Sequence, residues 1–149
     1  MSKKETGMKK VNGGVAEAAK MLSGLDLKDQ DRIMRELQKK DGKVADAIKQ
    51  NLISIDDLIY ITPAMLRDLI RSIPLNSFAL ALRAASPNVI QHILKNLTEN
   101  NRKDLLEIYK GPPKSMNVIE RARQDVLAIL RAKVEKQEIV LNKKGEKLV

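Results

Sequence analysis

The sequence predicts an all-α protein of about eight or nine short helices. Apolar residues recur every three or four positions along most of the chain, and no segment has a convincing strand pattern. Aromatic residues make up only 2% of the 149 residues and tryptophan is absent. The core must therefore be built from aliphatic side chains, which favour packed helices over a β-sandwich or barrel.

The first part of the chain predicts three amphipathic helices over residues 13–51, preceded by a basic flexible tail over residues 1–12. Gly13 and Gly14 are predicted to form a linker between the two, and Asp26 is a candidate N-cap of the second helix. Three such helices joined by short turns indicate an armadillo-like or α-solenoid unit, whose exposed flank needs a neighbour. The predicted apolar stripes are Val15, Ala18, Ala19 and Leu22; Ile33, Met34 and Leu37; and Val44, Ala45, Ile48 and Leu52.

A hinge-like segment over residues 52–57 is predicted to connect this unit to a C-terminal helical domain over residues 58–137. Within the segment, Ser54 and the aspartate three positions later have the pattern of a helix-capping box. A polar tail over residues 138–149 completes the predicted organisation, and its end is expected to fray. The hinge-like residues are Leu52, Ile53, Ser54 and Ile55.

The stretch from Phe78 to Pro112 is the most informative part of the chain, and it predicts three short helices. The first is opened by Pro74, and its alanines predict close helix packing. The second is opened by Ser86-Pro87 and the third by Thr98, which are ordinary helix-starting residues. Further helices are predicted from Thr62-Pro63 and from Met116 to about Lys136. The alanines of the helix opened by Pro74 are Ala79, Ala81, Ala84 and Ala85.

Composition excludes several classes of protein. The absence of cysteine excludes disulfides and thiolate metal sites and fits a reducing compartment. No apolar run approaches the ~20 residues that a membrane-spanning helix needs, and the lysine-rich start lacks the apolar segment of a secretory signal. These observations predict a soluble cytoplasmic protein.

The formal charge of +9 is concentrated towards the two ends of the chain. Residues 1–10 carry a net charge of +3 and residues 131–149 another +3, which leaves +3 for the 120 residues between them. Basic tails can attract nucleic acid or anionic lipid. Because base-stacking aromatic residues and a groove-reading helix are missing, solvated ends are the preferred interpretation and nucleic acid is disfavoured as a partner.

No catalytic, cofactor-binding or metal-binding constellation is predicted. His92 is the only histidine and is expected to be a solvated surface residue on the polar side of its helix, since no partner for metal binding accompanies it. Asp56 and Asp57 are expected to be acids at a helix N-terminus rather than catalytic carboxylates. Nothing in the sequence indicates an enzyme, a cofactor or a small-molecule substrate.

The order of these elements resembles the C-terminal part of the flagellar motor switch protein family FliG, from about Gly13 to Leu141. The run SFALALRAAS over residues 77–86 is similar to the family's "DLALALKGAS", and GGVAEAAKMLSGLD is similar to its glycine linker and first helix. The "MFVFEDL" hinge of the family corresponds to LISIDDL over residues 52–58, without the aromatic residues. Each of these matches is weak by itself, and the resemblance depends on their occurring together in the same order as in the family.

This resemblance implies a rotor protein that contacts its partners through a ridge of charges on the third helix of the 78–112 stretch. Arg83 stands at the family's upstream basic position and Lys114 at the basic position after the Gly-Pro turn. Arg102 lies two residues after the helix's basic position, which is Asn100 here, and Glu107 matches one of two family acids in one alignment. The pattern of charges is thus only partly kept.

The partners implied are other subunits of the switch complex and the cytoplasmic loop of the stator, with self-association by stacking. The implied location is the cytoplasmic face of the inner membrane, at the flagellar basal body. An upstream domain and the middle domain with its EHPQ signature are not in this chain, so a fragment and a stand-alone relative both remain open. Two alternatives also remain: an auxiliary paralogue or scaffold with the same fold and no torque role, and a basic-tail binder of nucleic acid or anionic surfaces.

Overall fold

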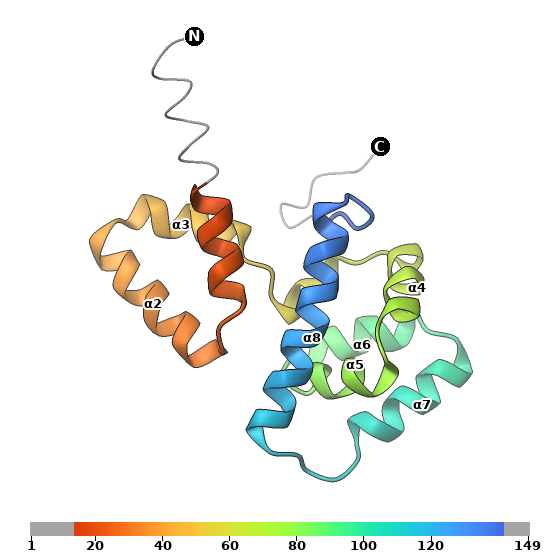
Figure 1. Cartoon of the computed structure of the whole chain (residues 1–149). Helices are drawn as coiled ribbons and strands as arrows, with labels where there is room; N and C mark the ends of the chain where they lie inside the picture. The colour runs from red at the N-terminus through yellow and green to blue at the C-terminus, as the bar shows by residue number, and fades with distance from the viewer. Residues whose placement is uncertain (1–13, 142–149) are drawn as a thin grey trace. The chain divides into compact units, whose positions relative to one another are not determined.

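The structure is a computed structural model that describes residues 14–141, and within that range it contains nine helices and no strand. Figure 1 shows the course of the chain through these helices. The all-α prediction is therefore confirmed for the part of the chain that is described. The chain divides into two compact units, with the division between Ile53 and Ser54. No helix in residues 14–141 is both long and apolar enough to cross a membrane.

The first unit consists of a helix over residues 14–23, α2 (Leu27–Lys40) and α3 (Gly42–Asn51). As predicted, Asp26 caps α2 by accepting a 2.8 Å hydrogen bond from the backbone N–H of Asp29. The core of the unit includes Ala19, Leu22 and Ile48, Ala45 is fully buried as well, and the other predicted stripe residues pack around the core half-buried. No residue of α2 is fully buried, so its apolar side is only partly covered within the described unit.

The second unit begins with the short 3-10 helix η1 (Ile55–Tyr60) and α4 (Pro63–Ser72). The predicted capping box is present, because the backbone N–H of Ser54 donates to the Asp57 carboxylate over 2.9 Å. Thr62 caps α4 through its hydroxyl, which accepts from the backbone N–H of Met65. Both starts follow directly from local sequence, since a capping side chain satisfies N–H groups that have no partner within the helix.

The centre of the second unit is α5 (Leu75–Leu82), in which the five consecutive residues Phe78–Leu82 are all buried. This helix packs against α7 (Glu99–Tyr109) and the long α8 (Met116–Glu135). Ala79 and Ala81 are fully buried, which confirms their predicted packing role, whereas Ala84 lies exposed in the turn after α5. The small side chains let neighbouring helices approach α5 closely from several directions.

The end of the described chain differs from the sequence prediction of a polar tail from residue 138. Gln137 has a φ of 61°, and the backbone N–H groups of Glu138 and Ile139 donate to the Lys133 carbonyl at 2.9 and 3.3 Å. This turn brings Ile139 back into the core, where it is 1% exposed. The core therefore extends beyond residue 137, and residues 142–149 lie outside the described range.

Candidate partner-binding surface

The charged helix α7 is held at its start by its own cap and by Arg102. Thr98 accepts a 3.3 Å hydrogen bond from the backbone N–H of Asn101. The guanidinium of Arg102 turns back and donates to the carbonyl oxygens of Leu94 and Leu97 over 3.0 and 3.3 Å. Leu94 lies in the last turn of α6 (Pro87–Lys95) and Leu97 two residues after its end, where carbonyl groups commonly need partners from outside the helix. Arg102 thus joins α7 to the end of the preceding helix.

The other end of α7 is held by Arg83, which follows α5. Its guanidinium donates to the carbonyl oxygen of Ile108 over 2.7 Å and to that of Pro112 over 2.9 Å. Gly111 allows this turn to close, since a Cβ there would lie only 3.2 Å from the Ile108 carbonyl oxygen. A cation beside the last carbonyls of a helix also interacts favourably with the negative end of the helix dipole.

Between these two ends, α7 presents a mixed row of charges to solvent. Lys103, Asp104, Glu107 and Lys110 are exposed, while Leu105 on the opposite side is fully buried. Lys114, after the Gly-Pro turn, is exposed as well. Of the four predicted partner-binding residues, Arg102, Glu107 and Lys114 are exposed and Arg83 is half-buried, and the two arginines bond to backbone carbonyls. The sequence contained no signal for those two contacts.

Ion pairs made by two residues of α8, Arg123 and Lys133, were not identified from the sequence. Arg123 is 3% exposed, and its Nε and Nη2 donate to the two carboxylate oxygens of Glu120 over 2.9 and 2.6 Å. The i,i+3 spacing of the two residues is a signal that could have identified this pair. Lys133 donates to Asp68 of α4 over 2.9 Å and lies 3.4 Å from Glu138. That hydrogen bond to Asp68 raises the pKa of Lys133 above its ordinary value of 10.5.

His92 is not the freely solvated residue that the sequence suggested. Its ring lies half-buried on α6, with Nε2 2.9 Å from the carbonyl oxygen of Ile61. The imidazole therefore connects α6 to the residue that follows η1. Asp56 makes a similar connection, because its carboxylate accepts from the backbone N–H of Ser86 over 2.8 Å and from the Ser86 hydroxyl over 3.0 Å. Residues 14–141 contain no group of three side chains suited to a metal ion.

The predicted hinge-like residues lie on both sides of the division between the two units. Leu52 is the half-buried C-cap of α3, and Ile53 is half-buried as well. Ser54 is exposed at the start of η1, and Ile55 is 5% exposed within that helix. Of the predicted linker, Gly14 begins the first described helix with open space around it, and Gly13 lies outside the described residues.

Comparisons with known proteins agree on one family. Residues 35–141 match the FliG C-terminal domain. The chain is 30% identical over 136 residues to the flagellar motor switch protein FliG of Thermotoga maritima, covering 89% of this chain and 40% of that protein. It is 26% identical over 136 residues to FliG of Borreliella burgdorferi, covering 90% of this chain and 39% of that one. The chain therefore spans about two fifths of the length of these relatives.

Solved structures show the same fold. The crystal structure of FliG residues 86–343 from H. pylori superposes with a TM-score of 0.63 at 19% identity, covering 84% of this chain and 59% of that one. Full-length FliG from Aquifex aeolicus superposes with a TM-score of 0.53 at 24% identity, covering 83% and 39%. Both support the predicted armadillo-like arrangement of helices.

Proposed function

The chain belongs to the family of FliG C-terminal domains, and from this premise we propose that it is a rotor-type module of the bacterial flagellar motor switch. It acts by helix-surface and charge contacts in torque generation or rotation switching, and not by catalysis. The observation that carries the proposal is the family match over residues 35–141, which includes the whole of α7.

The physical arrangement of α7 suits this role. Its two ends are tied to neighbouring helices by Arg102 and Arg83, so its exposed charges are presented from a rigid support. Exposed ion pairs are worth only ~0–1 kcal/mol each. Contacts of this strength can form and break repeatedly as a partner moves past. Of the predicted contact residues, Arg102, Glu107 and Lys114 are exposed.

The proposed partners are other switch-complex subunits and the cytoplasmic loop of the stator, at the cytoplasmic face of the inner membrane. The first unit is proposed to stack on a neighbouring subunit, because the apolar side of α2 is only partly covered within the described unit. The segment Leu52–Ile55 is proposed as the hinge between the two units, and Gly13-Gly14 as a flexible linker before the first helix.

A second candidate function is supported by the contacts of Arg83 and Arg102. Because both guanidinium groups bond to backbone carbonyls, they are less available to a stator than the family's charge ridge would suggest. This is what we would expect of an auxiliary paralogue that keeps the fold and binds another adaptor, because its arginines at these positions would stabilise the fold and would not contact a stator.

The test is complementation of cells that lack this chain, with fluorescently tagged variants. Glu107→Lys and Lys114→Glu reverse exposed charges at the proposed surface, and Asp46→Lys and Lys49→Glu make the same changes at exposed positions of α3. The motor role predicts that only the first pair abolishes swimming while flagella still assemble. Normal swimming with fluorescence at the flagellar base would favour the auxiliary role. Normal swimming with none at the base would contradict both.

A further inference from the structure

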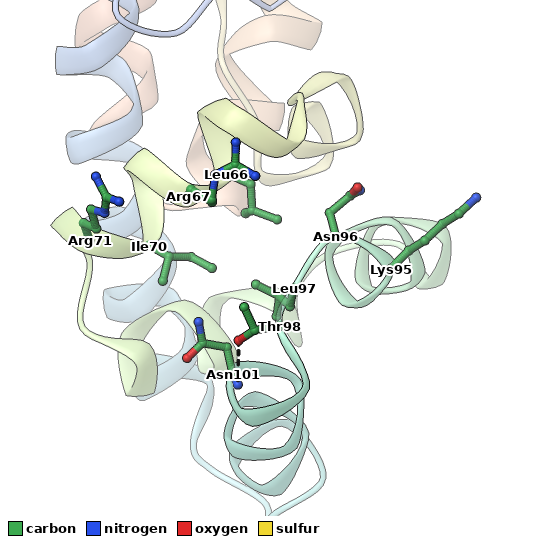
Figure 2. Close-up of a pocket in the computed structure, with 9 residues that line it drawn as sticks. All are labelled: Leu66, Arg67, Ile70, Arg71, Lys95, Asn96, Leu97, Thr98 and Asn101. Atoms are coloured by element: carbon green, nitrogen blue, oxygen red, sulfur yellow. Dashed lines mark hydrogen bonds between the residues drawn. The ribbon is translucent and has the colours of Figure 1, made fainter.

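A groove with an apolar floor and a cationic rim lies between α4 and the corner that joins α6 to α7. Its volume is about 510 Å³, which is within the usual range of ligand-binding pockets. Figure 2 shows Leu66 and Ile70 of α4 and Leu97 of the corner pointing into the space between these elements. Ile70 is half-buried and supplies most of the accessible apolar surface, while Leu66 and Leu97 are 1% and 8% exposed and lie beneath it.

The rim of the groove carries only positive charge. Arg67 and Arg71 extend from α4 and Lys95 from the end of α6, and all three are exposed. Figure 2 shows the side chains of Arg71 and Lys95 at opposite sides of the groove, directed outward. The nine lining residues include no acid. Asp68, the acid that follows Arg67, bonds to Lys133 of α8.

We propose that this groove binds an acidic amphipathic helix of a partner protein. An apolar stripe would pack on Ile70 and the small exposed part of Leu97, and carboxylates on its two flanks would pair with Arg67 and Arg71 on one side and Lys95 on the other. This is the general mode in which a helix docks its apolar face into a groove. The proposal does not depend on the motor role, because it concerns a different surface from the exposed charges of α7.

Other occupants fit the groove less well. A second copy of this chain and the chain's own lysine-rich termini are disfavoured by charge, since the chain carries +9. A nucleic acid would find no aromatic side chain among the nine lining residues on which to stack a base. A free oxyanion would use the cations and leave the apolar floor without a function. Only a ligand that is both apolar and acidic uses both the apolar floor and the cationic rim.

The test measures binding of a fluorescein-labelled helical peptide of about 14 residues, long enough for four turns. The peptide has leucines along one face and glutamates on both flanks. Two matched peptides replace the glutamates by glutamine or the leucines by serine. The protein is the full chain, as wild type, as Arg67→Gln/Arg71→Gln/Lys95→Gln, and as the control Arg32→Gln/Arg35→Gln/Lys39→Gln. The control removes three exposed cations from α2 and changes the net charge equally.

The proposal expects the groove variant to bind the acidic peptide about tenfold or more weakly than the control variant, because three rim contacts are lost together. Both matched peptides should bind more weakly than the parent, and added salt should weaken binding further. Equal loss in the two protein variants would mean general charge attraction and would overturn the proposal. Displacement by inorganic phosphate, together with undiminished binding of the serine peptide, would identify a simple oxyanion site and would overturn it as well.

Discussion

The guanidinium of Arg83 lies 2.7 Å from the carbonyl oxygen of Ile108, and this contact joins the end of α5 to the end of the charged helix α7. The two residues are 25 positions apart in sequence. The same guanidinium reaches the Pro112 carbonyl, so that one side chain satisfies acceptors on both sides of Gly111. A residue at a position associated with recognition in the family therefore has a structural contact in this chain.

Replacing Arg83 is expected to lower the free energy of unfolding. Arg83→Gln removes two charge-assisted hydrogen bonds and should cost about 1.5–3 kcal/mol, whereas Arg83→Lys should cost less because an ammonium can keep one of them. Urea denaturation of the full chain measures the difference. Arg67→Gln, which removes an exposed charge, is the control and should change stability by less than about 0.5 kcal/mol. Equal stability of wild type and Arg83→Gln would contradict the structural role.

The Asp56 carboxylate is expected to stabilise the start of α6 from outside that helix. It accepts from both the backbone N–H and the hydroxyl of Ser86, the residue immediately before Pro87. Asp56→Ala should lower the free energy of unfolding by about 1 kcal/mol, as the loss of a helix cap usually does. Thermal and urea unfolding measure this cost. The matched control Asp46→Ala removes an exposed acid of α3, and an equal effect of both changes would exclude a specific cap.

The contribution of Lys133 to stability should depend on pH in the alkaline range. Because Asp68 raises the pKa of Lys133, the folded state holds this proton more tightly than the unfolded state does. The stabilisation is therefore complete below the ordinary value of 10.5 and is lost as the pH rises through the raised value. Urea denaturation at a series of pH values measures the stability difference between wild type and Lys133→Gln. This difference should stay constant up to about pH 10 and shrink above that pH.

Lys136→Gln provides the control for this pH series, since Lys136 is an exposed lysine at the end of the same helix. Its stability difference from wild type should be small across the whole range. A difference for Lys133→Gln that grows with pH would have the wrong sign and would rule out the pairing with Asp68.

Ile139 is expected to contribute to the core although it lies in a segment with a polar sequence. Ile139→Ala removes a side chain that is 1% exposed and should lower the free energy of unfolding by about 2–5 kcal/mol. Val140→Ala is the neighbouring control, because Val140 is 45% exposed, and its cost should stay below about 0.5 kcal/mol. Denaturant unfolding compares the two variants. Similar small effects would show that the chain beyond α8 does not belong to the core.

The starts of the helices were largely predictable from the sequence. Asp26, Ser54, Thr62 and Thr98 begin helices at the places where the sequence indicated, because each is hydrogen-bonded to the residue only three positions later. The apolar stripes were predictable for the same reason, since helical periodicity alone places their members on one face. The burial of Ile139 was missed because the chain turns back at Gln137, which has a positive φ. Glycine is the residue that usually indicates such a turn, and it is absent there.

The sequence by itself determined the fold class, the helices and the family, because these depend on periodicity, capping residues and the order of short matches. Tertiary structure alone decided what the long polar side chains do. Arg83 and His92 contact backbone carbonyls 25 and 31 positions away and Lys133 contacts a carboxylate 65 positions away, and the local sequence does not distinguish such contacts from exposure to solvent. Only the packing of α5, α6 and α8 against their neighbours brings those acceptors within reach.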